Sequence, residues 1–94
     1  MRFIIEGVIK EITYLNEDNG VVEFIIEVSE NCKFLVALTS RTQLKSEINI
    51  NNIIGKSYRI GCRLFTRTRI NSKGDYIYLN TIYAGEMEEI KIEK

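Results

Sequence analysis

Hydrophobic and polar residues alternate along most of this chain, and this period of two predicts strands rather than helices. The clearest run is residues 21–29, "VVEFIIEVS", in which alternate positions from Val22 to Val28 are apolar. Glu23 and Glu27 fall between them on the other face of the strand. Successive side chains of a strand point to opposite faces, so this segment is predicted to bury one face and expose the other.

Four more segments share this character. Residues 2–15 are rich in β-branched and aromatic residues and predict a long strand, in which Gly7 indicates a bulge or sharp bend. Residues 33–39, the stretch after Gly55 up to 69, and residues 76–84 predict three further strands. Turn residues separate them at 16–20, which contains Asn19-Gly20, and at 29–32 and 70–75.

The alternation fails in two places. Residues 40–54 predict a loop with at most one short helical turn, and residues 85–94 predict a short acidic tail, of which 90–93 could add a strand. Five apolar strands with a break after the third and a glycine within the first indicate a closed barrel, because closure removes exposed strand edges. We therefore predict an all-β, five-stranded OB-fold: a partly open Greek-key barrel forming one domain over residues 1–94.

The net charge of zero conceals an uneven distribution. Residues 1–40 hold three basic and seven acidic side chains, residues 41–74 hold eight basic and one acidic, and residues 75–94 hold two basic and five acidic. A basic middle between acidic ends favours an anionic partner, most often a nucleic acid.

The basic charge is concentrated in one predicted strand. Its alternation places on one face Arg59, Arg63, Phe65, Arg67 and Arg69. Lys73 extends this row into the hairpin, and Tyr76 and Tyr78 return on the next strand. Guanidinium groups match phosphate oxygens, and exposed rings let bases stack, so the row is typical of single-strand binding. Arg41 and Lys56 belong to the same basic region and complete the predicted nucleic-acid site.

A second interpretation of the row is an ordinary solvated strand face, whose charges are neutralised by Glu23 and Glu27 on a neighbouring strand. Five other aromatic residues are assigned to packing, because rings at alternating positions usually pack in a core or an interface. These are Tyr14, Tyr58, Tyr83, Phe24 and Phe34.

The sequence argues against an enzyme and against a metal or cofactor site. It contains no histidine, nucleophile motif or phosphate loop. Cys32 and Cys62 lie far apart, so we expect neither a disulfide nor a metal site, and Cys62 is expected to be a buried thiol. With no apolar run long enough for a membrane span and no signal peptide, we expect a cytoplasmic protein without a membrane partner.

The run "GCRLFTRTRINSKGDYIYLNTIYAGEMEEI" resembles the fourth and fifth strands of bacterial single-stranded DNA-binding proteins. "IIEGVIKEI" and "NGVVEFIIEV" are similar to the first and second strands, and "FLVALTSRTQL" to the third strand and the short helix after it. Related primosomal replication proteins are similar in the same respects. The resemblance implies an OB-fold, binding of single-stranded DNA, and assembly into homodimers or homotetramers.

The resemblance carries over to a few positions only. Arg63, Thr66 and Arg67 match basic-strand positions of the family, and Tyr78 matches the tyrosine that leads its fifth strand. The tryptophans on which the family commonly stacks bases have no counterpart here, so stacking must rest on Phe65, Tyr76 and Tyr78. The acidic stretch at 86–94 also does not match the family's flexible tail, which has an acidic, hydrophobic tip.

The leading hypothesis is a non-catalytic, sequence-nonspecific single-stranded DNA-binding protein, acting in replication, repair or mobile-element transfer. Two alternatives remain. The same face could bind RNA, because both polymers expose phosphates and bases. The arginine row could instead dock an acidic protein partner or the acidic segments of a second copy.

Overall fold

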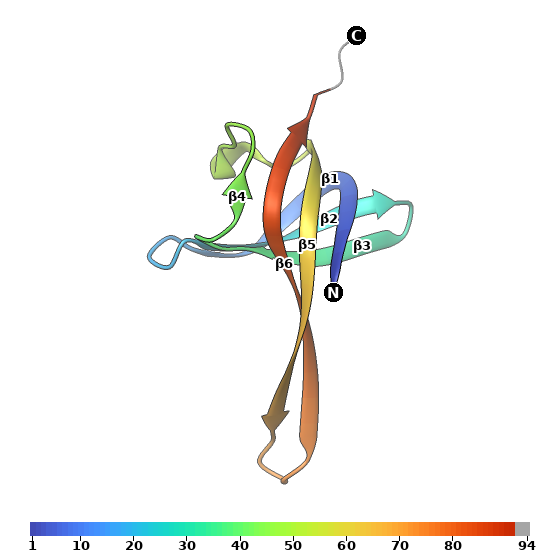
Figure 1. Cartoon of the computed structure of the whole chain (residues 1–94), viewed down its shortest axis with the longest axis vertical. Helices are drawn as coiled ribbons and strands as arrows, with labels where there is room; N and C mark the ends of the chain where they lie inside the picture. Colours follow the sequence, from blue (N-terminus) through green and yellow to red (C-terminus); the bar gives the residue numbers. More distant parts are fainter. Residues whose placement is uncertain (92–94) are drawn as a thin grey trace.

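The computed structural model describes residues 1–91, which form six strands and one 3-10 turn (Figure 1). In chain order they are β1 (Arg2–Asn16), β2 (Val21–Ser29), β3 (Cys32–Leu38), β4 (Gln43–Leu44), η1 (Ile50–Asn52), β5 (Ser57–Ile70) and β6 (Tyr76–Ile90). The five long strands agree with the alternation pattern. The predicted loop at 40–54 contains the two-residue β4 and the single turn η1.

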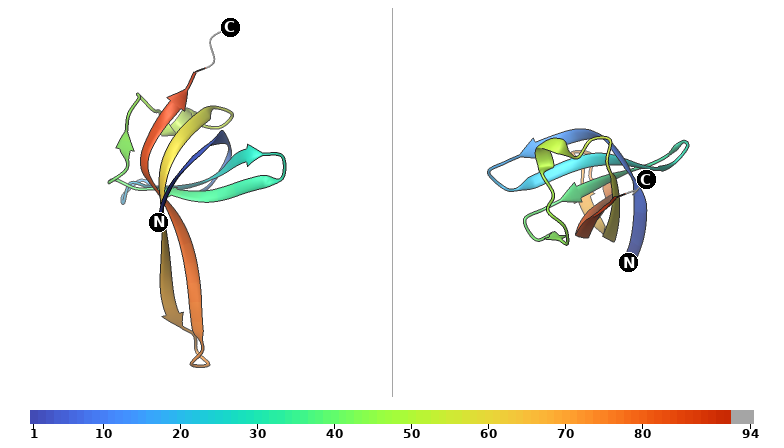
Figure 2. Two further views of the ribbon diagram at one scale, coloured as in Figure 1. Left: turned by 45° about the vertical axis from the view of Figure 1, so that its right-hand side comes forward. Right: turned by 90° about the horizontal axis from the view of Figure 1, so that it is seen from above.

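The strands form one sheet in the order β3-β2-β1-β5-β6-β4, and a further β3–β6 pairing closes it. That closing contact is parallel and joins Val36 to Ile82 and Ala37 to Tyr83. The result is a five-stranded all-β barrel with the OB-fold arrangement, as predicted, and Figure 2 shows the sheet curving round on itself. Within the described chain, β4 adds a short parallel strand to the outer edge of β6.

β1 serves two neighbours and bends between them. Its first half, Arg2 to Val8, pairs with β5, and its second half, Val8 to Asn16, pairs with β2. Gly7 lies where the strand changes partner, and a Cβ atom there would overlap the carbonyl oxygen of Glu27 on β2. The predicted bend at Gly7 is confirmed: the absent side chain lets two backbones approach closely. The two irregularities in the β1–β2 register lie further along the strand.

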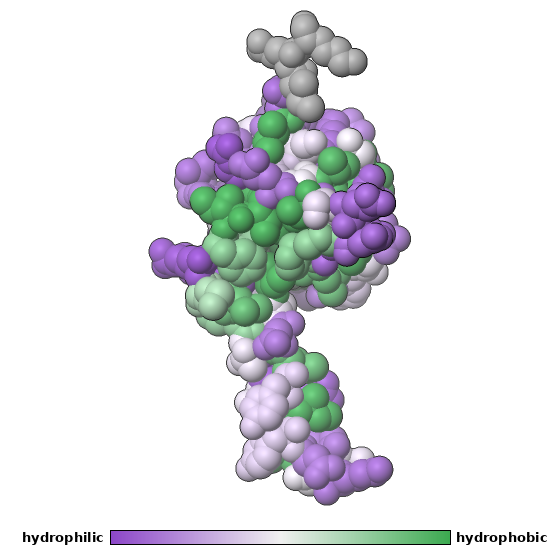
Figure 3. Space-filling model, turned by 90° about the vertical axis from the view of Figure 1, so that its right-hand side faces the viewer, coloured by the Kyte–Doolittle hydropathy of each residue, from purple (hydrophilic) through white to green (hydrophobic). Residues whose placement is uncertain are grey.

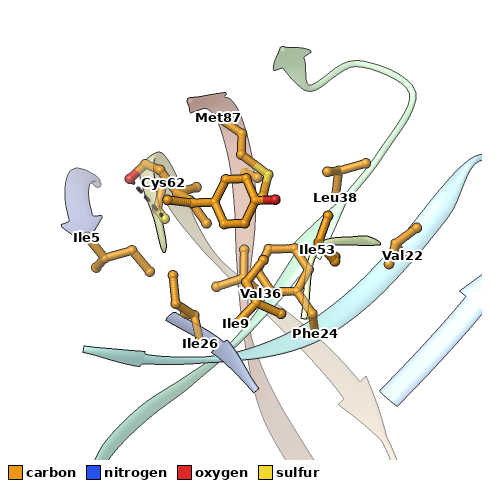
Figure 4. Close-up of a cluster of buried hydrophobic side chains, with 13 residues drawn as sticks. Ile5, Ile9, Val22, Phe24, Ile26, Val36, Leu38, Ile53, Cys62 and Met87 are labelled. Atoms are coloured by element: carbon orange, nitrogen blue, oxygen red, sulfur yellow. Dashed lines mark hydrogen bonds between the residues drawn. The ribbon is translucent and has the colours of Figure 1, made fainter. Parts of the chain in front are cut away.

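The core is built from the apolar faces of the strands (Figure 4). Phe24, Ile26, Tyr58 and Ile60 are at most 1% exposed, in agreement with the parity of β2 and β5. Val28 has the predicted parity but is exposed, because it lies near the end of β2, beyond the packed centre. Other predicted core positions divide: Phe34 is partly buried at the edge of the core, and Tyr14 is exposed.

β5 and β6 continue beyond the barrel as a two-stranded arm, which gives the molecule extents of 56 × 32 × 22 Å (Figure 1). β1 accompanies β5 only as far as Arg63, with one more bond from the Leu64 amide to the Met1 carbonyl. β3 meets β6 only at Ile82 and Tyr83. The arm therefore comprises residues 65–81, and it has no strand on either side in residues 1–91.

The arm closes in a turn organised by Asn71, whose side-chain oxygen accepts hydrogen bonds from the amides of Lys73 and Asp75, both at 2.9 Å. Gly74 supplies the positive φ of 83° that this turn needs.

At the C-terminal end of β6, the prediction of an acidic tail is wrong for residues 85–90, which belong to β6 and pair with β5 and β4. Met87 is buried between charged neighbours, which continues the alternation of a strand. Of the strand predicted at 90–93, Ile90 is the last residue of β6, and residues 92 and 93 lie outside the described residues.

Candidate nucleic-acid interface

The outer face of β5 carries the predicted row in the predicted parity. Tyr58, Ile60 and Cys62 are buried, whereas Arg59, Arg63 and Phe65 are exposed on the opposite face. Arg67 and Arg69 continue that face along the arm. The alternation alone was enough to predict this, because the period of a strand is local to it.

The residues of the predicted site have different surroundings, because the neighbouring strands place carboxylates beside some of them and not beside others. Arg59 lies opposite Glu6 of β1, and its Nε is 2.7 Å from the Glu6 carboxylate. That hydrogen bond and the charge of Glu6 raise the pKa of Arg59 above its usual value. Lys56 makes an ion pair of 3.6 Å with Glu89. These two predicted binding residues are therefore already neutralised.

Glu23 and Glu27 are not the neutralising groups. Glu27 lies 4.0 Å from Lys33 within the β2–β3 hairpin, and within residues 1–91 neither glutamate pairs with an arginine. Within residues 1–91, no ion pair forms at five predicted binding residues, which are Arg41, Arg63, Arg67, Arg69 and Lys73. Their positive charges are available to an external anion.

Three of these free arginines line one groove of about 600 Å³ at the junction of barrel and arm. Arg63 and Arg67 come from β5, and Arg41 comes from the loop after β3. Asn19 and Val21, at the β1–β2 turn, form part of the same rim. The groove thus lies between the β1–β2 turn and the β5–β6 hairpin, and OB-folds bind oligonucleotides on the face that these loops flank.

Tyr83 belongs to this groove, although the sequence analysis assigned it to packing. Its ring makes an edge-to-face contact with Phe65, with ring centroids 5.7 Å apart and an angle of 68° between the planes. Its hydroxyl accepts a hydrogen bond of 2.8 Å from Nη2 of Arg67. A ring pair and an oriented guanidinium are thereby placed side by side on the groove wall.

The register of the β5–β6 hairpin could have placed Tyr83 on the arginine side. The pairing Ile70↔Tyr76 at its tip sets the register, and counting back along both strands brings Tyr83 opposite Arg63. Directly paired residues of an antiparallel ladder share a face, so Tyr83 joins the arginine side. Parity along β6 alone could not show this.

The same register puts Tyr76 and Tyr78 on the other face of the arm. They pair with Ile70 and Thr68, which have the opposite parity to the arginines. On that second face Thr66 also donates a 2.7 Å hydrogen bond to the side chain of Asn80. The expectation that these tyrosines adjoin the arginine row is therefore wrong, because returning residues inherit the face of their cross-strand partners. Arg69 and Lys73 lie further out, on the arm and at its tip.

Other chemistry is sparse in residues 1–91. They contain no group of three or more histidine, cysteine, aspartate or glutamate side chains arranged to hold a metal ion. Cys62 is buried as predicted, and burial raises the pKa of its thiol to about 11. None of the helices in this range is both long and apolar enough to span a membrane.

Comparison with solved structures finds the same architecture in a protein of different sequence. The chain is similar to the mitochondrial single-stranded DNA-binding protein Rim1 of S. cerevisiae, with a TM-score of 0.58 and 12% sequence identity. The match covers 99% of this chain and 96% of that one. No protein-family model matches the chain, and no curated protein is significantly similar to it in sequence. The similarity confirms the OB-fold.

Proposed function

We propose that this protein is a non-catalytic, sequence-nonspecific binder of single-stranded DNA. The observation that carries the proposal is the groove at the base of the arm, which is lined by the Phe65–Tyr83 ring pair and by three arginines that have no ion-pair partner in residues 1–91. Arg41, Arg63 and Arg67 would contact phosphates. The two rings would supply a surface for bases, and stacking of this kind is worth about 1–3 kcal/mol per base.

The fold supports this assignment in a second way. The groove is flanked by the β1–β2 turn and the β5–β6 hairpin, the loops with which OB-folds hold oligonucleotides. Rim1, which has the same fold, is a single-stranded DNA-binding protein. The free charges of Arg69 and Lys73 would continue the basic surface along the arm for longer strands.

Titration of a fluorescently labelled oligothymidylate at several salt concentrations tests the proposal. Each phosphate contact contributes about −0.7 to the log–log slope, so three arginines predict a slope near −2. R67A should weaken binding roughly tenfold, because hydrogen bonds to charged groups contribute about 1.5–3 kcal/mol. The matched control is R59A, on the same strand and face but already paired with Glu6, which should change the affinity less than twofold.

Equal effects of R67A and R59A, or an absence of binding at low salt, would refute the proposal. Competition with an RNA of matched sequence separates the RNA alternative, because only the 2′-hydroxyl distinguishes the two polymers at such a site. If the arginines instead contact an acidic protein partner or a second copy, R67A will change the mass of that protein complex, as measured by light scattering. In that case the original protein will show no affinity for DNA.

A further inference from the structure

We propose that Arg2 and Arg63 together form a phosphate-binding site on the barrel. This site extends the path of the bound DNA from the groove onto β1. This inference rests on the proposed function and adds a residue, Arg2, that was absent from the predicted site. The site lies where β1 and β5 run side by side (Figure 1).

The register of β1 and β5 places the two arginines directly opposite each other. Directly opposite residues of an antiparallel pair share a face. The same register pairs Ile4 with Gly61 and Glu6 with Arg59, so the Glu6–Arg59 ion pair identifies this as the outer face. Arg2 is exposed there, and the Leu64 amide bonds the Met1 carbonyl at 3.0 Å, which keeps this end of β1 in the sheet.

Two arginines in this position repel each other. Like charges directly across a ladder are destabilising, whereas opposite charges stabilise, as they do four residues away at Glu6 and Arg59. Among residues 1–91 no carboxylate forms an ion pair with Arg2 or Arg63. An anion that enters between them would remove the repulsion and gain two guanidinium contacts.

The surface around the pair is shaped to admit a ligand. Arg2 and Arg63 line a second hollow of about 600 Å³, which shares Arg63 and Gly85 with the groove and therefore adjoins it. Gly85 is the extra residue of a bulge in β6, between the pairs Gly61↔Glu86 and Cys62↔Ala84.

A Cβ atom at Gly85 would lie 3.3 Å from the Gly61 carbonyl oxygen and 3.7 Å from Nε of Arg63. Gly85 thus leaves bare backbone beside the guanidinium, over which a phosphate could pass closely, whereas the side chain of Glu86 lies over Gly61. One carboxylate, Glu86, also lines the hollow, and it is neutralised by Lys45 at 3.1 Å. The chemistry of the site therefore fits the phosphodiester groups of the bound strand.

The experiment compares R2A, R2E and K10A by oligothymidylate titration against salt. R2A should weaken binding about fivefold and make the log–log slope shallower by about 0.7, the contribution of one phosphate contact. K10A is the control: Lys10 is exposed on the same strand, far from the hollow, and should leave both values unchanged. R2E should bind more weakly than R2A, yet melt at a higher temperature than the original protein, because it faces Arg63 with an opposite charge.

The length of the oligothymidylate then separates a local site from a general charge effect. As the oligothymidylate is shortened, the effect of R2A on affinity should vanish before that of R67A, because a short oligonucleotide occupies the groove alone. If R2A behaves like K10A at every length while R67A still weakens binding, the Arg2–Arg63 site is refuted and the proposed function stands. If neither R2A nor R67A weakens binding, the proposed function itself fails.

Discussion

The ladder formed by β5 and β6 passes through two surroundings, and the comparison between them explains where the candidate site lies. In the barrel, from Ser57 to Arg63, β5 has β1 on one side and β6 on the other. Over residues 65–81 the two strands stand alone as the arm within the described chain. Figure 3 shows the arm projecting from the barrel, with polar and apolar side chains mixed on the face in view.

Charge is handled differently in the two parts. In the barrel part, acidic residues of β1 and β6 pair with Arg59 and Lys56, so most charges are neutralised on the spot. In the arm and at its base, Arg63, Arg67 and Arg69 have no ion-pair partner among residues 1–91. The difference teaches that a charge row seen in one strand stays available to an external anion only where the adjacent strands leave it unpaired.

The comparison also predicts that most of the stability comes from the barrel. The largest expected loss of stability is that of Phe24→Ala. Phe24 is fully buried in the barrel core, so its truncation should lower the free energy of unfolding by about 3–5 kcal/mol. Phe65→Ala, at the base of the arm, is the matched control and should cost about 1 kcal/mol, since it loses mainly the contact with Tyr83. Urea denaturation measures both, and equal costs would contradict the division.

Gly7→Ala should come next. The added methyl group would meet the backbone of Glu27, which cannot move without disturbing the β2–β3 hairpin, so a loss of about 1–3 kcal/mol is expected. Gly61→Ala provides the contrast. Its methyl would meet the side chain of Glu86 at 2.8 Å, and that flexible group can rotate away. A Gly61 variant as unstable as the Gly7 variant would show that backbone approach is not the cause.

A smaller effect is expected at alkaline pH. Burial raises the pKa of Cys62 from 9.0 to about 11, so between these values the native state holds a proton that the unfolded state has lost. Stability from this group is therefore complete below pH 9 and declines as pH rises, by about 1 kcal/mol at pH 10. Burial and Glu89 raise the pKa of Tyr58 as well, which adds loss in the same direction.

Urea titrations of Cys62→Ala and the original protein between pH 8 and pH 10.5 isolate the thiol contribution. The variant should start less stable, because it loses buried volume, but its stability should fall less steeply with pH. Parallel profiles for the two proteins would mean that the Cys62 thiol does not contribute to the alkaline loss.

The smallest expected effect is that of Tyr78→Ala, on the face of the arm turned away from the arginines. Tyr78 is 67% exposed, so the change in unfolding free energy should stay within about 0.5 kcal/mol. Its effect on oligothymidylate affinity sharpens the comparison between the two faces of the arm. If Tyr78→Ala lowers this affinity as much as Phe65→Ala does, the bound DNA wraps around the arm and uses both faces.

Much of the fold could be predicted from residue patterns, because strands and turns depend on neighbours in the chain. The alternation in 21–29 located β2, Asn19-Gly20 located a turn, and Gly7 located the bend in β1. The end of β6 could not be placed in this way. Its last residues are acidic and resemble a tail, and they become strand because β5 and β4 supply hydrogen-bonding partners on both sides.

The sequence by itself determined which side chains of β5 point outward together, since that depends only on the period of a strand. It could not determine which of them remain free, because Glu6 and Arg59 are brought together from 53 positions apart. Only the tertiary structure decided that Tyr83 joins the arginines, that Tyr76 and Tyr78 leave them, and that Arg2 faces Arg63. The physical reason is that cross-strand register is set by hydrogen bonds and bulges between distant segments, and no single strand records it.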